Sequence, residues 1–355
     1  MKPSILYMLT SLDTTGGTTA KIISTIKYTK YNVYLTTRNN IGHKKPDGLL
    51  EGKNVTIIQT PENILRTIFK LNRIIRKEKI GIVHAFFPKE TYIAFVLKLL
   101  NPQLKIIRSF EGTVKRGKTI TAISRSILPH FDKIIFISKY VQDYYEELTK
   151  KCKNKVIVDN SAYHTYSYMI RKKDNTCKLL DVAGLNPTKN IFLHAEIGKV
   201  LKTRNFPFII KIAGDGPYRE KLEKMIENYQ IQENLILLGN QSEPRPYYEE
   251  ADIFVHPADM EGFGLVVPEA MSSGLPVILS NKGALPELVK NMEDGIIVDA
   301  YNPEEWADAI IKLYNDRDLY EKLSKNGYET YKTRFTPEIY AGNLDKLYDT
   351  LLSLK

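Results

Sequence analysis

The chain lacks the features that mark secreted, zinc-binding or membrane-spanning proteins. Its 355 residues include only two cysteines, Cys152 and Cys177, which give neither a disulfide framework nor a zinc-ligand spacing. A reducing compartment is therefore expected, and we predict a cytoplasmic protein. No apolar run approaches the roughly 20 residues that a membrane-spanning helix needs, so any membrane contact is expected to be peripheral. The short apolar run at residues 5–9 is predicted to be a buried strand and not a signal peptide.

Charge is distributed unevenly along the chain. Residues 1–155 hold 28 Lys and Arg against 11 Asp and Glu, a net charge of +17, whereas residues 156–355 hold 23 against 30, a net charge of −7. This asymmetry indicates an anionic partner for the first half. Signatures of nucleic-acid binding are lacking, so nucleic acid is not the predicted partner. An anionic membrane face, a phosphate-bearing acceptor and a basic surface that serves only solubility are the open alternatives.

Strand-like and helix-like segments alternate through both halves. Short β-rich runs form two sets of six, within residues 5–137 and 178–298, and most are separated by helix-period segments. This alternation predicts an α/β protein with two parallel sheets, each in a Rossmann-like domain. The predicted organisation is an N-terminal domain at 1–159, a polar, Tyr-rich linker at 160–176, a C-terminal domain at 177–336 and a closing helix at 337–355.

Residues 64–79 have the pattern of a basic amphipathic helix. Apolar residues fall on one broad face, and Arg and Lys populate the rest. A helix of this kind can lie on a membrane surface. A Rossmann-like domain also needs a helix at this point to cover its sheet, and packing against the core is the favoured interpretation.

The residues most suited to chemistry lie between positions 251 and 295. A predicted strand ends there in a turn that contains Glu261 and Gly264, and Pro268 and Glu269 follow. Glycine permits a tight turn with close backbone approach to a ligand, and proline suits the first turn of a helix. Glu261 is therefore predicted on the strand-to-helix turn and Glu269 in the helix behind it, where free N–H groups can bind phosphate. From the residues alone, capping or solvated glutamates are an equally good interpretation.

The spacing of Glu261 and Glu269 resembles the Glu-x7-Glu signature of the family-4 retaining glycosyltransferases. Four further segments follow the order of that family: residues 182–190, 212–217, 275–278 and 283–295. The resemblance covers nearly all of residues 178–335. In the N-terminal half it is looser and includes Gly16-Gly17, residues 82–84 and residues 137–141.

This resemblance implies the GT-B fold, in which two Rossmann-like domains face a central cleft and a C-terminal helix closes back on the N-terminal domain. It implies a retaining hexosyl-type transferase whose donor is a nucleotide-diphosphate sugar, with UDP as the expected nucleotide. The implied acceptor is a carbohydrate, a lipid-linked sugar or a phosphate-bearing polymer of bacterial-type surface glycan synthesis. No metal and no cofactor is expected, because a lysine and a helix N-terminus take the metal's place at the diphosphate.

The resemblance also implies roles for individual residues. Lys189 would lie on the donor diphosphate, Glu261 would contact the transferred sugar, and Glu269 would bind the donor ribose. The further donor contacts are Phe263, Gly264, Leu265 and Gly17. On the acceptor side, the predicted residues are His84, Glu111, Lys115, Arg116 and Lys118.

Three positions leave alternatives open. Gly184 stands where the family usually has arginine, and glycine offers the phosphate no side-chain hydrogen bond. Glu111 replaces a histidine that the family often has, and could act as the acceptor base or only cap a turn. His84 could line the cleft or be structural. A non-catalytic GT-B partner subunit and a GT-B nucleotide-sugar epimerase therefore remain as alternative functions.

Overall fold

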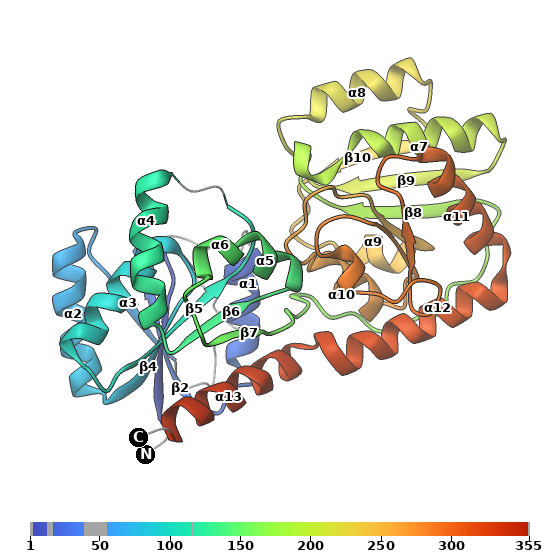
Figure 1. Ribbon diagram of the computed structural model, residues 1–355. Coiled ribbons are helices and arrows are strands. Elements are labelled where there is room, and N and C mark those ends of the chain that lie inside the picture. The colour runs from blue at the N-terminus through green and yellow to red at the C-terminus, as the bar shows by residue number, and fades with distance from the viewer. Residues whose placement is uncertain (1–2, 13–16, 39–54, 115–116, 354–355) are drawn as a thin grey trace. The chain divides into compact units, whose positions relative to one another are not determined.

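A computed structural model describes residues 3–12, 17–38, 55–114 and 117–353 (Figure 1). The chain divides into two compact units. The N-terminal unit consists of Met1–Tyr163 together with Pro337–Lys355, and the C-terminal unit is His164–Thr336. The 160–176 segment that was predicted as a linker thus contains the boundary between the units, and most of it belongs to the C-terminal one.

A seven-stranded parallel sheet forms the centre of the N-terminal unit, in the order β3-β2-β1-β4-β5-β6-β7. The six predicted runs are all strands of this sheet, and β7 is an addition. Its three residues are too few to show a periodicity. The strands are β1 (Ser4–Met8), β2 (Asn32–Thr37), β3 (Val55–Gln59), β4 (Ile80–Ala85), β5 (Lys105–Phe110), β6 (Lys133–Phe136) and β7 (Lys155–Ile157).

Helices cover both faces of this sheet (Figure 1). One face carries α2 (Ile64–Lys77), α3 (Pro88–Leu100) and α4 (Lys118–Ile127), and the other carries α1 (Gly17–Ile26) and α13 (Pro337–Ser353). Short helices η1 (Leu128–His130), α5 (Lys139–Tyr144) and α6 (Glu146–Thr149) complete the unit. Tyr340, Leu344 and Tyr348 of α13 lie in the same core cluster as Ile22 and Ile23 of α1. The C-terminal helix therefore closes back on the N-terminal domain, as predicted.

Only part of the apolar face of α2 packs against the sheet. Leu71 and Ile75 are buried, which confirms that the helix covers the core. Leu65 and Phe69 are 66% and 73% exposed. They lie roughly 100° round the helix from the buried stripe, because each residue turns the helix by about 100°. The apolar arc of α2 is thus wider than the surface that the sheet offers it.

The C-terminal unit contains a six-stranded parallel sheet in the order β10-β9-β8-β11-β12-β13. All six predicted runs are present as β8 (Cys177–Val182), β9 (Phe208–Ala213), β10 (Leu235–Gly239), β11 (Ile253–His256), β12 (Val277–Ser280) and β13 (Ile296–Val298). In each sheet the strand order reverses beside the first strand, between β1 and β4 and between β8 and β11. These are two Rossmann-like domains, and ligands of such sheets bind outside the carboxyl ends of the strands at the reversal.

Helices also flank the second sheet on both faces (Figure 1). They are η2 (Pro187–Lys189), α7 (Phe192–Thr203), α8 (Arg219–Asn228), α9 (Arg245–Glu250), α10 (Val266–Ser272), η3 (Leu285–Glu287), α11 (Pro303–Asn315) and α12 (Arg317–Thr330), followed by a π-helical turn at Tyr331–Phe335. Trp306 of α11 is fully buried in this core, and its indole N–H donates to the carbonyl oxygen of Asp299 at 2.8 Å.

Candidate functional site

Lys189 and Glu261 come from two turns that are hydrogen-bonded to each other. Lys189 ends the single turn η2 after β8, and Glu261 lies on the turn between β11 and α10. The backbone N–H groups of Asp259 and Met260 both donate to the carbonyl oxygen of Thr188 at 3.0 Å. These two bonds fix the turn after β11 against η2, and the Lys189 ammonium forms an ion pair with Oε2 of Glu261. The structure therefore brings together the two residues predicted as catalytic in this unit.

Glycines let the backbone fold tightly around Glu261. Gly264 has φ of 92° and Gly283 has φ of 59°, a region that side chains rarely adopt. A Cβ atom on Gly283 would lie 2.6 Å from the carbonyl oxygen of Glu261, and one on Gly264 would lie 3.2 Å from its Cγ. The N–H of Ala284 donates to that same carbonyl oxygen at 2.9 Å. Both glycines are therefore needed to keep Glu261 in its position.

A buried chain of ionisable groups continues from Glu261 into the core. Nε2 of His256 lies 3.4 Å from Glu261 Oε2, and its Nδ1 lies 2.7 Å from Asp181 Oδ1. The other oxygen of Asp181 lies 2.9 Å from Nε2 of His194. His256, Asp181 and His194 are fully buried, whereas the Glu261 and Lys189 side chains are 14% and 22% exposed. Of these five groups, only Lys189 and Glu261 reach the surface of the unit.

The contacts in this chain shift the pKa values of its members. Burial disfavours the ionised form of Glu261, but the hydrogen bond from His256 and the charge of Lys189 outweigh it and lower the pKa to about 2. Burial likewise disfavours the imidazolium of His256, but the charge and hydrogen bond of Asp181 raise its pKa to about 9. Asp181 is also buried, and its two histidine partners nevertheless hold its pKa below the usual range. At neutral pH the site thus contains ionised Asp181 and Glu261 with cationic His256 and Lys189.

Glu269 lies in a different set of contacts. It is on α10, is 5% exposed, and its two carboxylate oxygens accept from the backbone N–H of His164 and the hydroxyl of Tyr248, both at 3.1 Å. These bonds connect the helix to the start of the C-terminal unit and to α9. The predicted ribose ligand therefore also braces the domain that carries it.

The predicted backbone donors lie at the start of α10. Phe263 is buried and meets Phe335 edge to face at 5.7 Å between ring centroids. Leu265 is the residue before the helix, and the carbonyl of Gly264 accepts from Val267 at 3.0 Å. The N–H groups of Phe263, Gly264 and Leu265 therefore come before the first bonded turn, where a helix offers them no acceptor of its own.

Gly184 lies in the turn between β8 and η2. A Cβ atom there would lie 3.2 Å from the side-chain nitrogen of Asn186 and 3.7 Å from the carbonyl oxygen of Asp215. The nearer atom is the end of a side chain, which can shift. The backbone therefore leaves room for a side chain at 184, and the glycine is not explained by a positive φ or by a backbone clash.

Glu111 follows β5 in the N-terminal unit and is bound to a buried lysine. The ammonium of Lys21, which is fully buried on α1, donates to Glu111 Oε2 at 2.6 Å and to the hydroxyl oxygen of Tyr340 at 3.1 Å. The other carboxylate oxygen of Glu111 is buried and accepts no hydrogen bond from the described residues. Glu111 is thus the counter-ion of Lys21, a role that neither of its predicted functions included.

His84 is a fully buried histidine with both ring nitrogens engaged. Nδ1 lies 2.8 Å from the hydroxyl of Tyr348, and Nε2 lies 2.6 Å from that of Ser109. Burial lowers its pKa well below the usual value, and the nearby cations Lys21 and Arg108 lower it further. This is the geometry of a neutral structural histidine, and it corresponds to the second of the two interpretations stated for His84.

The other predicted residues of this unit are only partly described. Gly17 is the first residue of α1, and Lys118 is the exposed first residue of α4. Lys115 and Arg116 lie outside the described residues. Within the described ranges, no three His, Cys, Asp or Glu side chains are grouped so that they could hold a metal ion.

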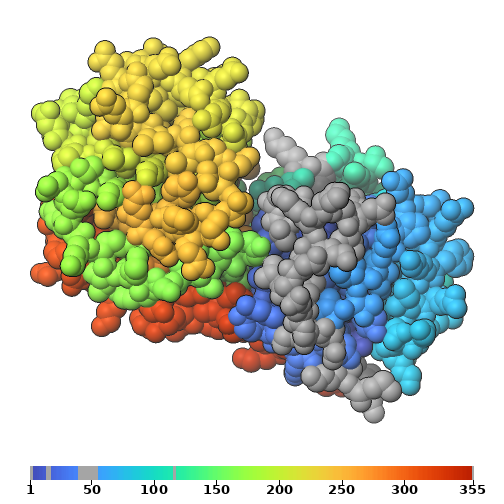
Figure 2. All heavy atoms as spheres, turned by 180° about the vertical axis from the view of Figure 1, so that it is seen from behind, coloured from blue at the N-terminus to red at the C-terminus, as the bar shows by residue number. Residues whose placement is uncertain are grey.

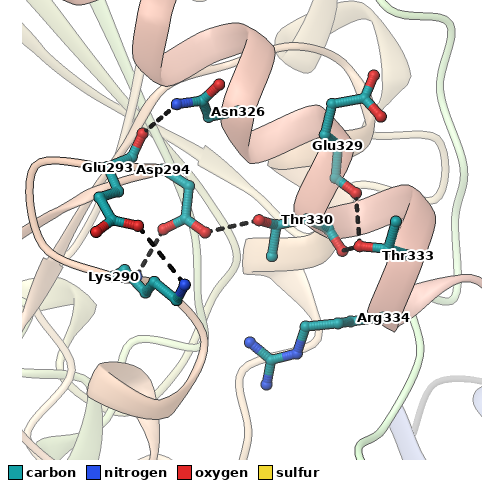
Figure 3. Close-up of a pocket in the computed structure, with 8 residues that line it drawn as sticks. All are labelled: Lys290, Glu293, Asp294, Asn326, Glu329, Thr330, Thr333 and Arg334. Carbon is teal, nitrogen blue, oxygen red and sulfur yellow. Dashed lines mark hydrogen bonds and ion pairs between the residues drawn. The ribbon is translucent and has the colours of Figure 1, made fainter.

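A cavity of about 380 Å³ lies in the C-terminal unit, and its lining residues come from residues 290–294 and from residues 326–334. Figure 3 shows the side chains that line it. Asp294 accepts from the backbone N–H of Lys290 and from the hydroxyl of Thr330, both at 2.6 Å. Asn326 donates to the carbonyl oxygen of Glu293 at 2.8 Å. The bonds of Glu293 and Asp294 to Asn326 and Thr330 connect this loop to α12.

Sequence reasoning missed Asp181, His194, His256 and Lys21. Asp181 stands among apolar residues of a buried strand, and Lys21 among those of a helix. A charged residue in such a run is rarely fully buried without a partner, and that rule was the available signal. The charged partners of Lys21 and Asp181 include Glu111 and His256, which lie 90 and 75 residues away in the sequence, and only the fold brings them together.

Comparison with known proteins agrees with these observations. A sequence model of "Glycosyl transferases group 1" matches residues 168–330, and one of "Glycosyltransferase Family 4" matches residues 31–158. An uncharacterized glycosyltransferase of Methanocaldococcus jannaschii is 28% identical over 319 residues, 85% of this chain and 86% of the relative. The capsular polysaccharide biosynthesis glycosyltransferase CapM of Staphylococcus aureus is 24% identical over 314 residues, 81% of each chain. HepE of Anabaena, solved in complex with UDP and glucose, has a TM-score of 0.79 at 16% identity over 98% of this chain and all of the other.

The fold and these matches define a glycosyltransferase with the GT-B architecture. The two family matches together span both halves of the chain, and the chain belongs to the family-4, or group 1, glycosyltransferases. Membership in this family favours a transferase over the epimerase and the non-catalytic subunit that the sequence left open.

Proposed function

We propose that the protein is a retaining glycosyltransferase that moves a hexose from a UDP-sugar to an acceptor of surface glycan or glycolipid synthesis. The observation that carries the proposal is the ion pair of Lys189 and Glu261 at the carboxyl end of the second sheet, backed by buried His256. The solved complex of HepE with UDP and the role of CapM in capsule synthesis support the donor and the kind of product.

In the proposed reaction the C-terminal unit binds the donor. Lys189 and the N–H groups of Phe263, Gly264 and Leu265 meet the diphosphate and sugar hydroxyls, Glu261 contacts the transferred sugar, and Glu269 contacts the ribose. The bond from the sugar C1 to the diphosphate oxygen breaks, the acceptor oxygen bonds to C1 on the same face, and the leaving diphosphate takes the acceptor proton. A fixed cation stabilises this transition state more than the ground state, because the diphosphate gains negative charge as the bond breaks.

A thermal-shift screen across nucleoside diphosphates tests the donor assignment. UDP is expected to raise the melting temperature more than ADP, GDP or CDP, because a ligand stabilises the fold by RT ln(1 + [L]/Kd). The same order should appear in turnover with the corresponding hexose donors. A larger shift with another base would replace UDP in the proposal, and no shift with any diphosphate would contradict a nucleotide-sugar donor.

Activity is expected to survive removal of divalent cations. In the proposed site the charge of the diphosphate is met by the Lys189 ammonium, and no Asp-x-Asp pair stands at the end of a strand to hold a metal. We would compare initial rates before and after dialysis against EDTA, with heat-treated protein as the background. Complete loss of rate that magnesium or manganese restores would overturn this prediction.

The outward face of α2 supports a peripheral position on an anionic membrane. None of the helices in the described part of the chain combines the length and hydropathy needed to cross a bilayer. The helix has no acidic residue, and its exposed Leu65 and Phe69 stand beside cations. A surface hollow of about 540 Å³ is lined there by Phe69, Lys70, Arg73, Ile74 and Lys77. Apolar side chains and cations on one face suit the boundary between acyl chains and phosphate headgroups.

The occupant we propose for this face is an anionic bilayer that carries a lipid-linked acceptor. Figure 2 shows the light-blue stretch of chain that includes α2 at the surface of the N-terminal unit. Each Lys or Arg near such a surface contributes about 1 kcal/mol, so a few suffice for reversible attachment.

Replacing Arg73 and Lys77 with serine is expected to lower partition onto anionic liposomes by about 10- to 30-fold, at about 1 kcal/mol for each cation. Sedimentation with anionic and neutral liposomes at low and high salt measures this, because salt shortens the Debye length. The matched control changes Lys221 and Lys224, two exposed lysines of α8, to serine.

A second arm replaces Lys115, Arg116 and Lys118 with alanine. Binding that ignores lipid charge and salt would contradict the membrane proposal, and loss only in the second arm would move the contact to residues 115–118.

A further inference from the structure

Asp181, Glu261, His256 and Lys189 form a charged cluster at the proposed sugar site. Of its two cations, Lys189 is partly exposed and can move, and His256 is buried. Lys189 is on a surface turn, and its side chain is 22% exposed. His256 is at the end of β11, fully buried, with Asp181 behind it. Both cations reach the same oxygen of Glu261, Oε2. If the proposed function holds, the donor diphosphate competes with Glu261 for Lys189, because it carries more negative charge than a single carboxylate.

Loss of Lys189 to the diphosphate would leave Glu261 with one cation. A buried carboxylate without a counter-charge takes up a proton or moves toward water. Either change would weaken its contact with the sugar. His256 lacks that freedom of movement, because it is fixed on the other side by Asp181 at 2.7 Å.

We propose that His256 is a positioning residue that stays protonated between Asp181 and Glu261 and keeps Glu261 ionised and in place while Lys189 serves the diphosphate. This inference rests on the proposed function, in which Glu261 contacts the sugar. It adds Asp181 and His256 to the residues on which turnover depends, although neither touches the donor.

The surroundings of His256 agree with this assignment. The titratable groups that face it are Asp181 on β8, Glu261 on the turn after β11, and Lys189 on η2. From β11 itself, Phe254 stacks on its ring at 6.0 Å between centroids, and the register partner on β12 is Leu279. Asp181 and Glu261 carry two negative charges, and the partly exposed Lys189 carries one positive charge. If the imidazole of His256 were neutral, one carboxylate charge would be left without a counter-charge.

His194 completes the charge balance as a neutral residue. Its Nε2 lies 2.9 Å from Asp181, and its Nδ1 is buried with no hydrogen-bond partner among the described residues. A cationic imidazole carries a proton on both nitrogens and would leave one buried N–H unpaired. Asp181 therefore has one cationic and one neutral histidine, and the cationic one is next to Glu261.

The first test reads the charge of His256 without using activity. Histidine-labelled enzyme is titrated by NMR, and the imidazole signals that vanish in His256→Gln identify this residue. We expect an imidazolium at about pH 8, where an ordinary histidine is neutral. A neutral His256 at about pH 7 in the folded enzyme would overturn the proposal.

The second test reads its effect on turnover. In His256→Gln we expect kcat to fall by about 10- to 100-fold with the donor KM little changed, the loss typical when a supporting residue behind a site is removed. The acid limb of kcat/KM should move upward by about one pH unit or more, because loss of an adjacent cation raises the pKa of Glu261. His194→Gln is the matched control, since it removes a buried histidine from the same aspartate without a contact to Glu261. A lower rate with an unmoved acid limb in His256→Gln, or an equal shift in His194→Gln, would overturn the proposal.

The role of Glu261 and the positioning role of His256 are separated by their variants. If Glu261→Gln keeps full activity, the sugar contact proposed for Glu261 is wrong whatever the state of His256. If Glu261→Gln is inactive while His256 titrates as an ordinary neutral residue, the proposed function stands and the positioning role is removed.

Discussion

Glu261→Gln is expected to lower kcat by about 10²- to 10³-fold, the usual cost of removing one preorganised polar group at a transition state, without weakening the affinity for the nucleoside diphosphate. The amide has the size of the carboxylate but no charge, so the contacts of Gly264 and Gly283 with residue 261 are preserved. The ion pair with Lys189 is lost, and the charge next to His256 with it.

Initial rates and isothermal titration with UDP separate these two effects. The control is Glu233→Gln, which changes an exposed glutamate of the same unit. Equal turnover in wild type and Glu261→Gln would remove Glu261 from the mechanism. A large loss of UDP affinity would instead assign Glu261 to nucleotide binding.

Glu269 requires a different substitution to give an interpretable result. Alanine would leave the N–H of His164 and the hydroxyl of Tyr248 without their acceptor, and a buried unpaired donor costs about 1–3 kcal/mol of stability. Glutamine retains one acceptor oxygen and disturbs the fold less. The nucleotide-affinity role of Glu269 is therefore best tested with glutamine, after the melting temperature has been compared with that of wild type.

Periodicity predicted the fold because both sheets are covered on two faces by helices. Buried parallel strands are mostly apolar runs: β12 is apolar up to its last residue, and β9 is apolar except at Lys211. The helices between such strands are amphipathic, so the alternation is visible in the sequence. The strand that escaped, β7, has three partly or fully exposed residues at the edge of its sheet. A strand this short has neither a run nor an alternation to detect.

The candidate site residues that belong to a motif could be predicted from the sequence, and those that only the fold brings together could not. Glu261 and Lys189 were predicted from the family pattern, and the structure places them in contact. His256 and Asp181 follow no motif, and their pairing depends on the carboxyl ends of β11 and β8, which are neighbours in the sheet. Glu111 shows the converse: its place in the pattern was recognised, but its buried partner on α1 was not.

Glu111→Gln is expected to lower the free energy of unfolding of the N-terminal unit by about 3–5 kcal/mol, because it leaves the Lys21 charge buried without a counter-ion. Among the described residues, the further contacts of the Lys21 ammonium are the hydroxyl and the ring of Tyr340. The matched control is Asp143→Asn, which breaks the exposed ion pair of Asp143 with Lys139 in the same unit. It should lower the free energy of unfolding by less than about 1 kcal/mol.

The probe must report on the correct unit. The single tryptophan, Trp306, is in the C-terminal unit, so its fluorescence follows the unfolding of that unit. Far-ultraviolet circular dichroism in urea includes the helices of both. In Glu111→Gln we expect part of the circular dichroism change to move to lower urea while the fluorescence midpoint stays in place. A shift no larger than that of Asp143→Asn would contradict the buried-charge argument.

Dependence on pH and a second substitution separate the structural from the catalytic role of Glu111. Burial lowers the pKa of Lys21, and loss of the opposing charge of Glu111 lowers it further. The folded variant then binds fewer protons than the unfolded chain, so its stability should rise as the pH approaches the ordinary lysine pKa of about 10.4. Adding Lys21→Met to Glu111→Gln removes the buried charge and should restore most of the stability. If the double variant is also active, Glu111 is a counter-ion only. If it is stable and inactive, the pair of Glu111 and Lys21 also contributes to turnover.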